Sequence, residues 1–462
     1  MATEAGGLGP GSILGSVLRR RSGLRQGADL NPGPGRSRGP DLSPGSGLSR
    51  GPDLSPGSGL SGSSNPSQGS VLNPIAGQGL GLSLEGGAVV RPLSLAQRLH
   101  LDLPLLFALL LAAGYGLLVL YSAIDQDPER LEAQLVRLGL AFTVMVVVAQ
   151  VPPALWRRLA APLYLAGVLT LVAVLLVGEI GKGAQRWLDL GVLRFQPSEL
   201  LKLGVPLLLA WFLALRPLPP GAWRTLGALV LTALPAVLIA RQPDLGTALL
   251  VGSAGLAVLF LAGLSWRLIA FLGATAAALA PLLWSQMLDY QKNRVLTLFD
   301  PERDPLGTGY HIIQSQIAIG SGGVYGKGWG QGTQSHLEFL PERSTDFIFA
   351  VLGEELGLFG VLALLGLYLF IVFRGLYLAS QCQDSFGRLL AGGLTLVFFV
   401  YLFVNTGMVS GLLPVVGVPL PLVSYGGTSM VTLLAGFGLI MSMVTHPGAT
   451  GRGGGGRILP RW

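Results

Sequence analysis

The sequence predicts an all-α polytopic membrane protein with about ten transmembrane helices, a large extracytoplasmic loop before helix 8 and a disordered N-terminal tail. Three observations carry this prediction. Half of the 462 residues are hydrophobic and only 12% are charged, with a mean hydropathy of +0.59. Apolar runs of roughly the 17–25 residues that a helix needs to span a bilayer recur along the chain. The composition also changes abruptly after Arg98.

Residues 1–92 form a Gly-, Ser- and Pro-rich tail, in which SRGPDLSPGSGL occurs in tandem at Ser37–Leu48 and Ser49–Leu60. Such a composition buries too little apolar surface to offset the entropy of ordering, so we expect disorder. The expected domains are this tail, a transmembrane domain over residues 93–446, and a Gly/Arg-rich tail over residues 447–462.

Ten apolar runs follow the N-terminal tail, some of which need flanking residues to reach a full span. They are Leu103–Ser122, Leu135–Val151, Leu159–Val177, Leu200–Leu215, Leu226–Ala240, Leu245–Leu264, Ile269–Leu288, Asp346–Phe373, Leu389–Val409 and Ser429–Val444.

The net charge of +7 comes from Arg residues in the tail and in short loops between apolar runs. This placement favours anionic membrane lipids as the partner and argues against nucleic acid. The single Cys382 excludes an intramolecular disulfide framework, and four widely separated His residues give no zinc-ligand spacing.

Charge in the short loops predicts the orientation. Loops rich in Arg, at 156–158, 216–224, 267 and 374–388, fall on one side, which we assign to the cytoplasm. An even number of helices then leaves both termini cytoplasmic. The other side receives the segments 125–132, 179–199, 241–244, 289–345 and 410–428, so every motif-like stretch lies on the outer face.

The large loop Asp289–Thr345 is too long for a simple connector. Within it, Tyr310–Ile317 has apolar residues at helical spacing and predicts a short interfacial helix. At its end Asp346 is expected to open the next helix, with Ser344 or Thr345 as N-cap. Asp346 then either complements the helix dipole or acts as a general base at the membrane surface.

Two further groups of ionisable residues lie near the outer face. Glu354 and Glu355 point to different sides of one helix, so one needs a partner on another helix; a functional site and a structural buried pair both fit. Arg194, Gln196, Glu199 and Lys202 surround a helix start at Pro197. Glu199 and Lys202, at i and i+3, suit either mutual neutralisation or binding of a phosphate or pyrophosphate.

The segment Pro414–Ser429 is apolar but interrupted by three prolines. Irregular backbone at membrane depth is tolerated where protein buries it or where it lines a cavity. This proline-broken segment is therefore a structural plug or a ligand-lining loop. From the residues alone, the site is extracytoplasmic, includes Asp346 with Arg194, Glu199, Lys202, Asp244 and Arg343, and suits an anionic amphipathic ligand.

Several ordered motifs resemble the SEDS family (shape, elongation, division, sporulation) over residues 95–446. They are Arg186–Asp189 with Arg194–Glu199, Gln242–Thr247, Gly328–Gly357 and Gly417–Gly427. The stretch Gly332–Arg343, GTQSHLEFLPER, resembles the rod-shape-determining RodA branch rather than the FtsW division branch.

The resemblance implies a ten-helix peptidoglycan glycosyltransferase of the bacterial plasma (inner) membrane that polymerises lipid II for cell-wall elongation and cell shape. It implies a class B penicillin-binding protein transpeptidase and the cell-elongation complex as partners. The Asp of the family's Thr-Asp-Phe stretch corresponds to Asp346, its proposed catalytic residue. Substrate binding is expected from the following residues: Arg194, Gln196, Glu199, Lys202, Asp244, Arg343, Ser424, Gly426 and Gly427. A divalent cation, Mg²⁺ or Mn²⁺, would be the cofactor.

Two rival hypotheses use the same residues. One is a lipid II flippase that works by alternating access, and the other is a non-catalytic scaffold for the transpeptidase. Transporters often contain inverted repeats with paired broken helices, and the sequence shows no convincing repeat of that kind.

Overall fold

The computed structural model describes residues 99–181, 184–189, 194–304, 307–337, 339–340 and 342–446. The two predicted tails, residues 1–92 and 447–462, lie outside the described residues.

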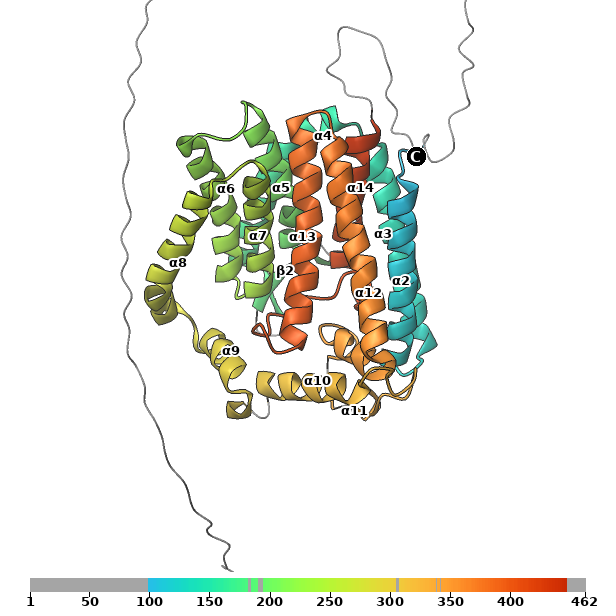
Figure 1. Cartoon of the computed structure of the whole chain (residues 1–462). Helices are drawn as coiled ribbons and strands as arrows, with labels where there is room; N and C mark the ends of the chain where they lie inside the picture. The colour runs from blue at the N-terminus through green and yellow to red at the C-terminus, as the bar shows by residue number, and fades with distance from the viewer. Residues whose placement is uncertain are drawn as a thin grey trace, which may run out of the picture. The chain divides into compact units, whose positions relative to one another are not determined.

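Each of the ten predicted apolar runs forms a helix, which confirms the helical fold class (Figure 1). By length and hydropathy alone, eight of these helices could cross a membrane in the described part of the chain, while α7 and the described part of α8 are shorter apolar helices. The total of about ten spans therefore stays a prediction. The helices are α2 (Leu103–Ala123), α3 (Pro128–Gln150), α4 (Pro153–Val177), α5 (Pro197–Ala214), α6 (Ala222–Arg241), α7 (Leu245–Leu261), α8 (Trp266–Gln286), α12 (Ile348–Gln381), α13 (Ser385–Val409) and α14 (Thr428–Thr445).

Aspartate side chains cap the N-termini of several of these helices. Asp102 accepts a hydrogen bond from the Leu105 N–H at the start of α2, and Asp244 accepts one from the Thr247 N–H at the start of α7. Each carboxylate satisfies a backbone donor that has no partner within its helix.

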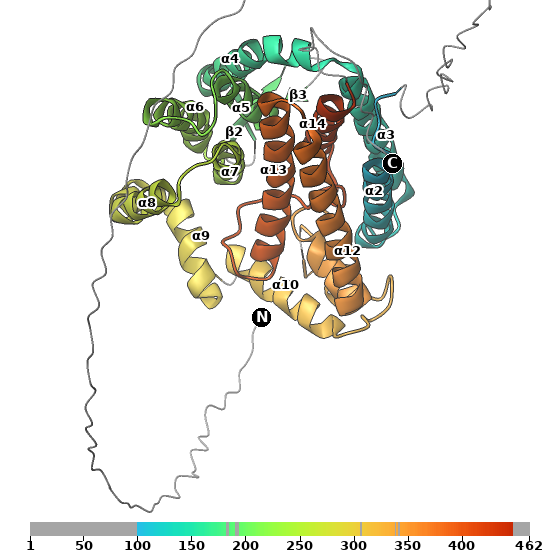
Figure 2. The ribbon, with the colours of Figure 1, turned by 45° about the horizontal axis from the view of Figure 1, so that its top comes forward.

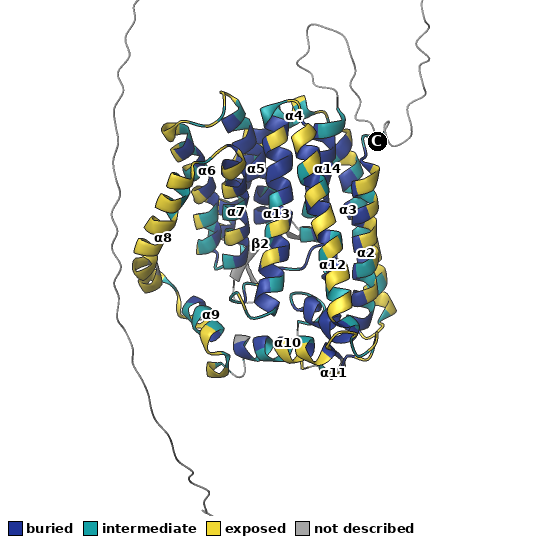
Figure 3. Cartoon of the chain, in the orientation of Figure 1, coloured by how far each residue is buried: buried dark blue, intermediate teal, exposed yellow. Residues whose placement is uncertain are grey.

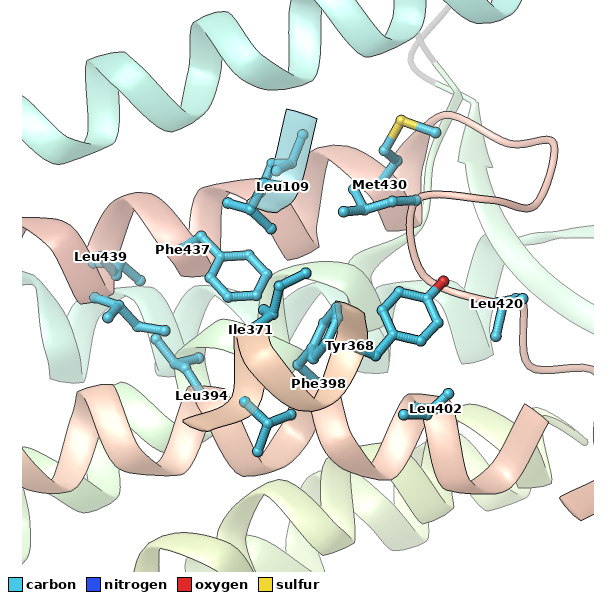
Figure 4. Packing of buried hydrophobic residues seen from close by; sticks show 14 of the residues in the cluster. Leu109, Tyr368, Ile371, Leu394, Phe398, Leu402, Leu420, Met430, Phe437 and Leu439 are labelled. Atoms are coloured by element: carbon cyan, nitrogen blue, oxygen red, sulfur yellow. The ribbon is translucent and has the colours of Figure 1, made fainter. Parts of the chain in front are cut away.

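The helices α5, α13 and α14 are the most buried of the candidate spans (Figure 3). Around them, edge-on aromatic contacts join Tyr368 to Phe398 and Phe398 to Phe437, with ring centroids 5.5 and 5.2 Å apart (Figure 4). Such pairs contribute about 0.5–1.5 kcal/mol each beyond the area that they bury. Helix α8, by contrast, is exposed along most of its length (Figure 3).

One end of the bundle carries most of the remaining structure (Figure 1). Helix α10 crosses the ends of α12 and α13 (Figures 1 and 2). It contains the segment predicted as a short helix. The elements here are α9 (Asp289–Phe299), η1 (Pro301–Arg303), α10 (Thr308–Gly322), α11 (Thr333–His336) and a small antiparallel sheet of β1 (Glu179–Gly181), β2 (Ala184–Asp189) and β3 (Arg194–Phe195). The sequence analysis did not predict this sheet.

The prediction that Asp346 opens the eighth apolar helix is wrong. Helix α12 begins at Ile348, and its N-cap Phe347 makes no side-chain capping bond. Glu342–Phe347 instead forms a turn, the Asp346 turn, because the Glu342 carbonyl accepts the Thr345 and Phe347 N–H groups. The Thr345 hydroxyl binds Glu342 as well, at 2.7 Å from its carboxylate. Neither Ser344 nor Thr345 is the N-cap of α12, and Asp346 is the residue directly before the N-cap Phe347.

Candidate functional site

The Asp346 turn is fixed by main-chain contacts to the proline-broken segment. The Tyr425 N–H donates to the Ser344 carbonyl at 2.8 Å, and the Ser424 hydroxyl donates to the Thr345 carbonyl at 2.6 Å. The Ser424 hydroxyl also accepts from the Leu420 N–H, so it links the proline-broken segment to the Asp346 turn. The turn that contains Asp346 is thus hydrogen-bonded to a segment that is far away in the sequence.

The Asp346 side chain is half-buried and its carboxylate lies beside Gly417. A Cβ atom at Gly417 would lie 3.3 Å from Asp346 Oδ2, and Gly417 adopts a φ of +73°. Glycine is the residue that adopts this conformation without a steric penalty. The backbone here can approach the carboxylate closely because no side chain intervenes.

One part of the proline-broken segment is buried and another part is half-exposed. Val418 and Leu420–Ser424 are buried, while Tyr425–Gly427 reach the surface of the bundle. Gln134 of α3 accepts from the Gly426 N–H at 3.3 Å, and Arg137 of α3 lies over the Tyr425 ring at 4.7 Å and alongside Gly427. The buried half agrees with the structural plug, and a ligand-lining role for the half-exposed part stays a prediction.

Arg343 lies at the start of the Asp346 turn. Its guanidinium pairs with Asp125, in the connection between α2 and α3, and donates to the Ser335 carbonyl. The Arg343 side chain is only 13% exposed, against 49% for Asp125. These contacts tie the turn to α11 and to the α2–α3 connection.

Glu199 and Lys202 form a buried ion pair on α5, with Lys202 Nζ 2.7 Å from Glu199 Oε1. The ammonium group also lies 5.3 Å from the centre of the Tyr401 ring on α13. A cleft opens between α5, α13 and α14 beside Lys202, Tyr401 and Thr432. Its empty volume is ≈ 340 Å³, which includes part of the open solvent at its mouth. The other Glu199 oxygen and the Tyr401 hydroxyl have no hydrogen-bond partner among the described residues.

Gln196 and Asp244 meet between the starts of α5 and α7, where Gln196 Nε2 donates to Asp244 Oδ2 at 3.4 Å. Arg194 pairs through its backbone with Asp189 in the small sheet, and its side chain lies outside the described residues. Gly246, two residues after Asp244, packs directly on the Val416 carbonyl. The start of α7 therefore contacts the proline-broken segment.

Glu354 and Glu355 both have hydrogen-bond partners outside their own helix, as expected. These contacts connect α12 to other parts of the fold. Glu355 accepts from the Ser122 hydroxyl of α2 at 2.6 Å. The fully buried Glu354 accepts from Lys327 Nζ at 2.7 Å, from the Thr333 hydroxyl at 3.1 Å, and from the N–H groups of Gln334 and Ser335 at 2.9 and 3.3 Å. Glu354 thus anchors residues 323–336, the Gly-rich loop, to α12.

Seven of the ten predicted site residues fall into two connected groups. The first is Asp346 and Arg343 in the Asp346 turn with Ser424, Gly426 and Gly427 of the proline-broken segment, and the second is Lys202, which lines the cleft, with its partner Glu199. Helix α13 joins the groups, because Tyr401 contacts Lys202 and Asn405 contacts the Asp346 carbonyl one helical turn later. Sequence reasoning missed Tyr401 and Asn405. An amide inside an apolar run was the available signal for Asn405.

The described residues offer no cluster of three or more His, Cys, Asp or Glu side chains that could hold a metal ion by themselves. Mg²⁺ is commonly held by one or two carboxylates together with substrate phosphates. In that arrangement Asp346 would be the protein's contribution, and a divalent cation stays a proposal.

Comparison with known proteins supplies the family. The model of the FtsW/RodA/SpoVE family, described as a cell cycle protein, matches residues 103–448. The peptidoglycan glycosyltransferase MrdB of Escherichia coli K12 is 56% identical over 350 residues, which is 76% of this chain and 95% of that protein. A probable peptidoglycan glycosyltransferase FtsW of Geobacter metallireducens is 36% identical, over 75% of this chain and 95% of its own length.

Solved structures agree. A chain from a peptidoglycan synthase complex, solved to show how polymerization and crosslinking are coordinated, is 37% identical, with a TM-score of 0.65 over 74% of this chain and 96% of its own length. The rod-shape-determining protein RodA of Thermus thermophilus is 35% identical, with a TM-score of 0.57 over 74% of this chain and 95% of that one. The sequence match, the helical bundle and these relatives together establish that the chain is a multi-pass membrane protein of the FtsW/RodA/SpoVE family.

Proposed function

We propose that the chain is a peptidoglycan glycosyltransferase that polymerises lipid II, with Asp346 as the general base. The names of the similar proteins supply the reaction class. The observation that supports the role of Asp346 is its position: a half-buried carboxylate in the turn before α12, whose neighbours Ser344 and Thr345 are hydrogen-bonded to the proline-broken segment.

The proposed step is a single displacement. A sugar hydroxyl of the acceptor attacks the anomeric carbon of the donor, and its proton passes to the Asp346 carboxylate. The bond between the anomeric carbon and the pyrophosphate oxygen breaks, and its electron pair leaves with the lipid pyrophosphate. Lys202 and Arg194 are the cations proposed to stabilise the charge on the leaving group. Gln196, Asp244, Arg343 and Ser424 are proposed to line the substrate site.

The orientation belongs to the same proposal. Residues 125, 196, 244, 343 and 424 lie in or next to five different connections, and ion pairs, hydrogen bonds and close contacts join these connections to one another or to the Asp346 turn. We infer that this end of the bundle faces the outside of the bacterial plasma membrane, with both termini in the cytoplasm. Membrane lipids would surround the helices, and a class B penicillin-binding protein of the elongation complex would cross-link the product.

The elongation role is favoured over a division role because the match to MrdB, at 56% identity, exceeds that to the FtsW relative, at 36%. The runner-up functions, a lipid II flippase and a scaffold for the transpeptidase, predict different outcomes in one experiment.

The purified full chain, with its cognate transpeptidase, is supplied with labelled lipid II in detergent and in vesicles. Glycan strands are expected from the wild type and from Asp300→Asn, which makes the same chemical change at an exposed carboxylate, and not from Asp346→Asn. Movement of lipid across vesicles without polymer would support the flippase. A wild type that neither polymerises nor moves lipid II would support the scaffold, and polymer that is equally abundant with Asp346→Asn would refute Asp346 as the base.

A further inference from the structure

A single side chain of α13 connects the two segments that hold the candidate base. Asn405 is fully buried, and its amide nitrogen Nδ2 donates to the Asp346 carbonyl at 2.9 Å and to the Val418 carbonyl at 2.7 Å. The first carbonyl belongs to the Asp346 turn and the second to the proline-broken segment. One amide group therefore bridges two stretches of irregular backbone.

The chemistry of the partners fixes the orientation of this amide. Both are carbonyl oxygens, which only accept hydrogen bonds, so the NH₂ group with its two donors must face them. A flipped amide would place Oδ1 against two other oxygens.

This orientation leaves Asn405 Oδ1 buried and without a partner among the described residues. A buried acceptor without a hydrogen bond destabilises the fold, and an apolar side chain of similar volume would avoid that loss. Stability of the local packing therefore does not explain an amide at this position. The two donated hydrogen bonds do.

The second acceptor is next to the residue that contacts the Asp346 carboxylate. Gly417 directly precedes Val418, and it is at Gly417 that the backbone approaches Asp346 Oδ2. Asn405 thus holds the main chain of Asp346 on one side and the backbone facing the Asp346 carboxylate on the other. The separation of these two groups is set by the length of one side chain.

We propose that Asn405 is a positioning residue for Asp346, an inference that rests on the proposed function. Its two hydrogen bonds hold the carboxylate at a fixed place relative to Gly417 and the rest of the proline-broken segment. Small displacements of a catalytic group of this kind cost about 10²-fold in rate. A positioning role therefore acts on turnover and leaves substrate binding unchanged.

The test uses the full chain with its transpeptidase and labelled lipid II. Asn405→Leu and Asn405→Asp keep the size of the side chain and remove the amide donors. Thr406→Val is the matched control, because the Thr406 hydroxyl donates only within its own helix, to Leu402 and Phe403. Turnover (kcat), KM for lipid II and the apparent Tm in detergent are measured for each.

Both Asn405 variants are expected to lose about 10–100-fold in kcat, with KM within about twofold of the wild type and a cooperative thermal transition. Thr406→Val should keep kcat within about twofold. Three results overturn the inference: a folded Asn405 variant with unchanged kcat, a loss confined to KM, or failure of both variants to fold, which would assign Asn405 to stability. If Asp346→Asn keeps its kcat, the proposed function fails, whatever Asn405 does. If Asp346→Asn is inactive and Asn405→Leu is active, only this inference fails.

Discussion

Replacing Glu354 by Gln should release the Gly-rich loop from α12 without unfolding the helix. Glu354 is fully buried and accepts four hydrogen bonds, from Lys327, Thr333, Gln334 and Ser335. The substitution keeps the shape of the side chain, removes its charge, and turns one acceptor into a donor that faces other donors. The Lys327 ammonium group loses its charge partner.

Removing one partner of a buried ion pair costs about 3–5 kcal/mol. We take the lower limit, about 3 kcal/mol, because the Lys327 side chain is 26% exposed and water can partly hydrate it. Since 1.4 kcal/mol is a tenfold change in an equilibrium constant, amide hydrogen exchange at Gln334 and Ser335 should become roughly 10²-fold faster.

The control is Thr333→Val, which removes one uncharged donor, keeps the ion pair between Lys327 and Glu354, and should lower the local opening free energy by about 1 kcal/mol. Hydrogen exchange of the purified protein in detergent, resolved to peptides that cover residues 327–337 and 365–378, measures the effect. The second peptide reports on α12 and should be unchanged in both variants. Exchange that is no faster in Glu354→Gln than in Thr333→Val would refute the proposed anchor.

Two further predictions concern packing and pH. Gly116→Ala should lower the apparent Tm and the polymerisation rate, because the new Cβ would lie 2.5 Å from the Leu422 carbonyl and 2.8 Å from Val423 Cα. Overpacking of this kind costs about 1–3 kcal/mol. Gly114→Ala on the same helix meets no atom within 4 Å and should change neither quantity, so equal effects of the two variants would contradict the packing. Burial lowers the pKa of His311 from its ordinary value of 6.5, against the opposing carboxylates of Glu342 and Asp304. The unfolded chain therefore binds more protons than the folded one just below that value, and thermal stability should fall as the pH drops from about 7.5 through this range. His311→Phe keeps an aromatic ring against Phe347 and should flatten the curve; an unchanged slope would exclude His311 as the cause.

The sequence predicted the helices well because apolar runs of the right length leave the backbone one way to satisfy its hydrogen bonds in lipid. The predicted start of α12, Asp346, was wrong by two residues. Ser344, Thr345 and Asp346 have the composition of an N-cap. Thr345 instead donates to Glu342, and the Ser344 and Thr345 carbonyls accept from Tyr425 and Ser424, some 80 positions away. The small sheet was missed because its strands are very short, at three, six and two residues.

The candidate site was predictable as a set of residues and not as a geometry. Glu199 and Lys202 are three residues apart on one helix, and their ion pair followed from that spacing. The partners Asp125 of Arg343, Ser122 of Glu355 and Asn405 of Asp346 come from distant helices and connections. No local pattern encodes such contacts, which depend on how the helices pack.

The most direct test of the central claim is the turnover number of Asp346→Asn at saturating lipid II, relative to the wild type. A general base contributes about 10²–10⁴ to a rate, so kcat should fall by a factor in this range while the apparent Tm and the affinity for lipid II stay the same. A kcat within about twofold of the wild type would contradict the assignment of Asp346 as the base.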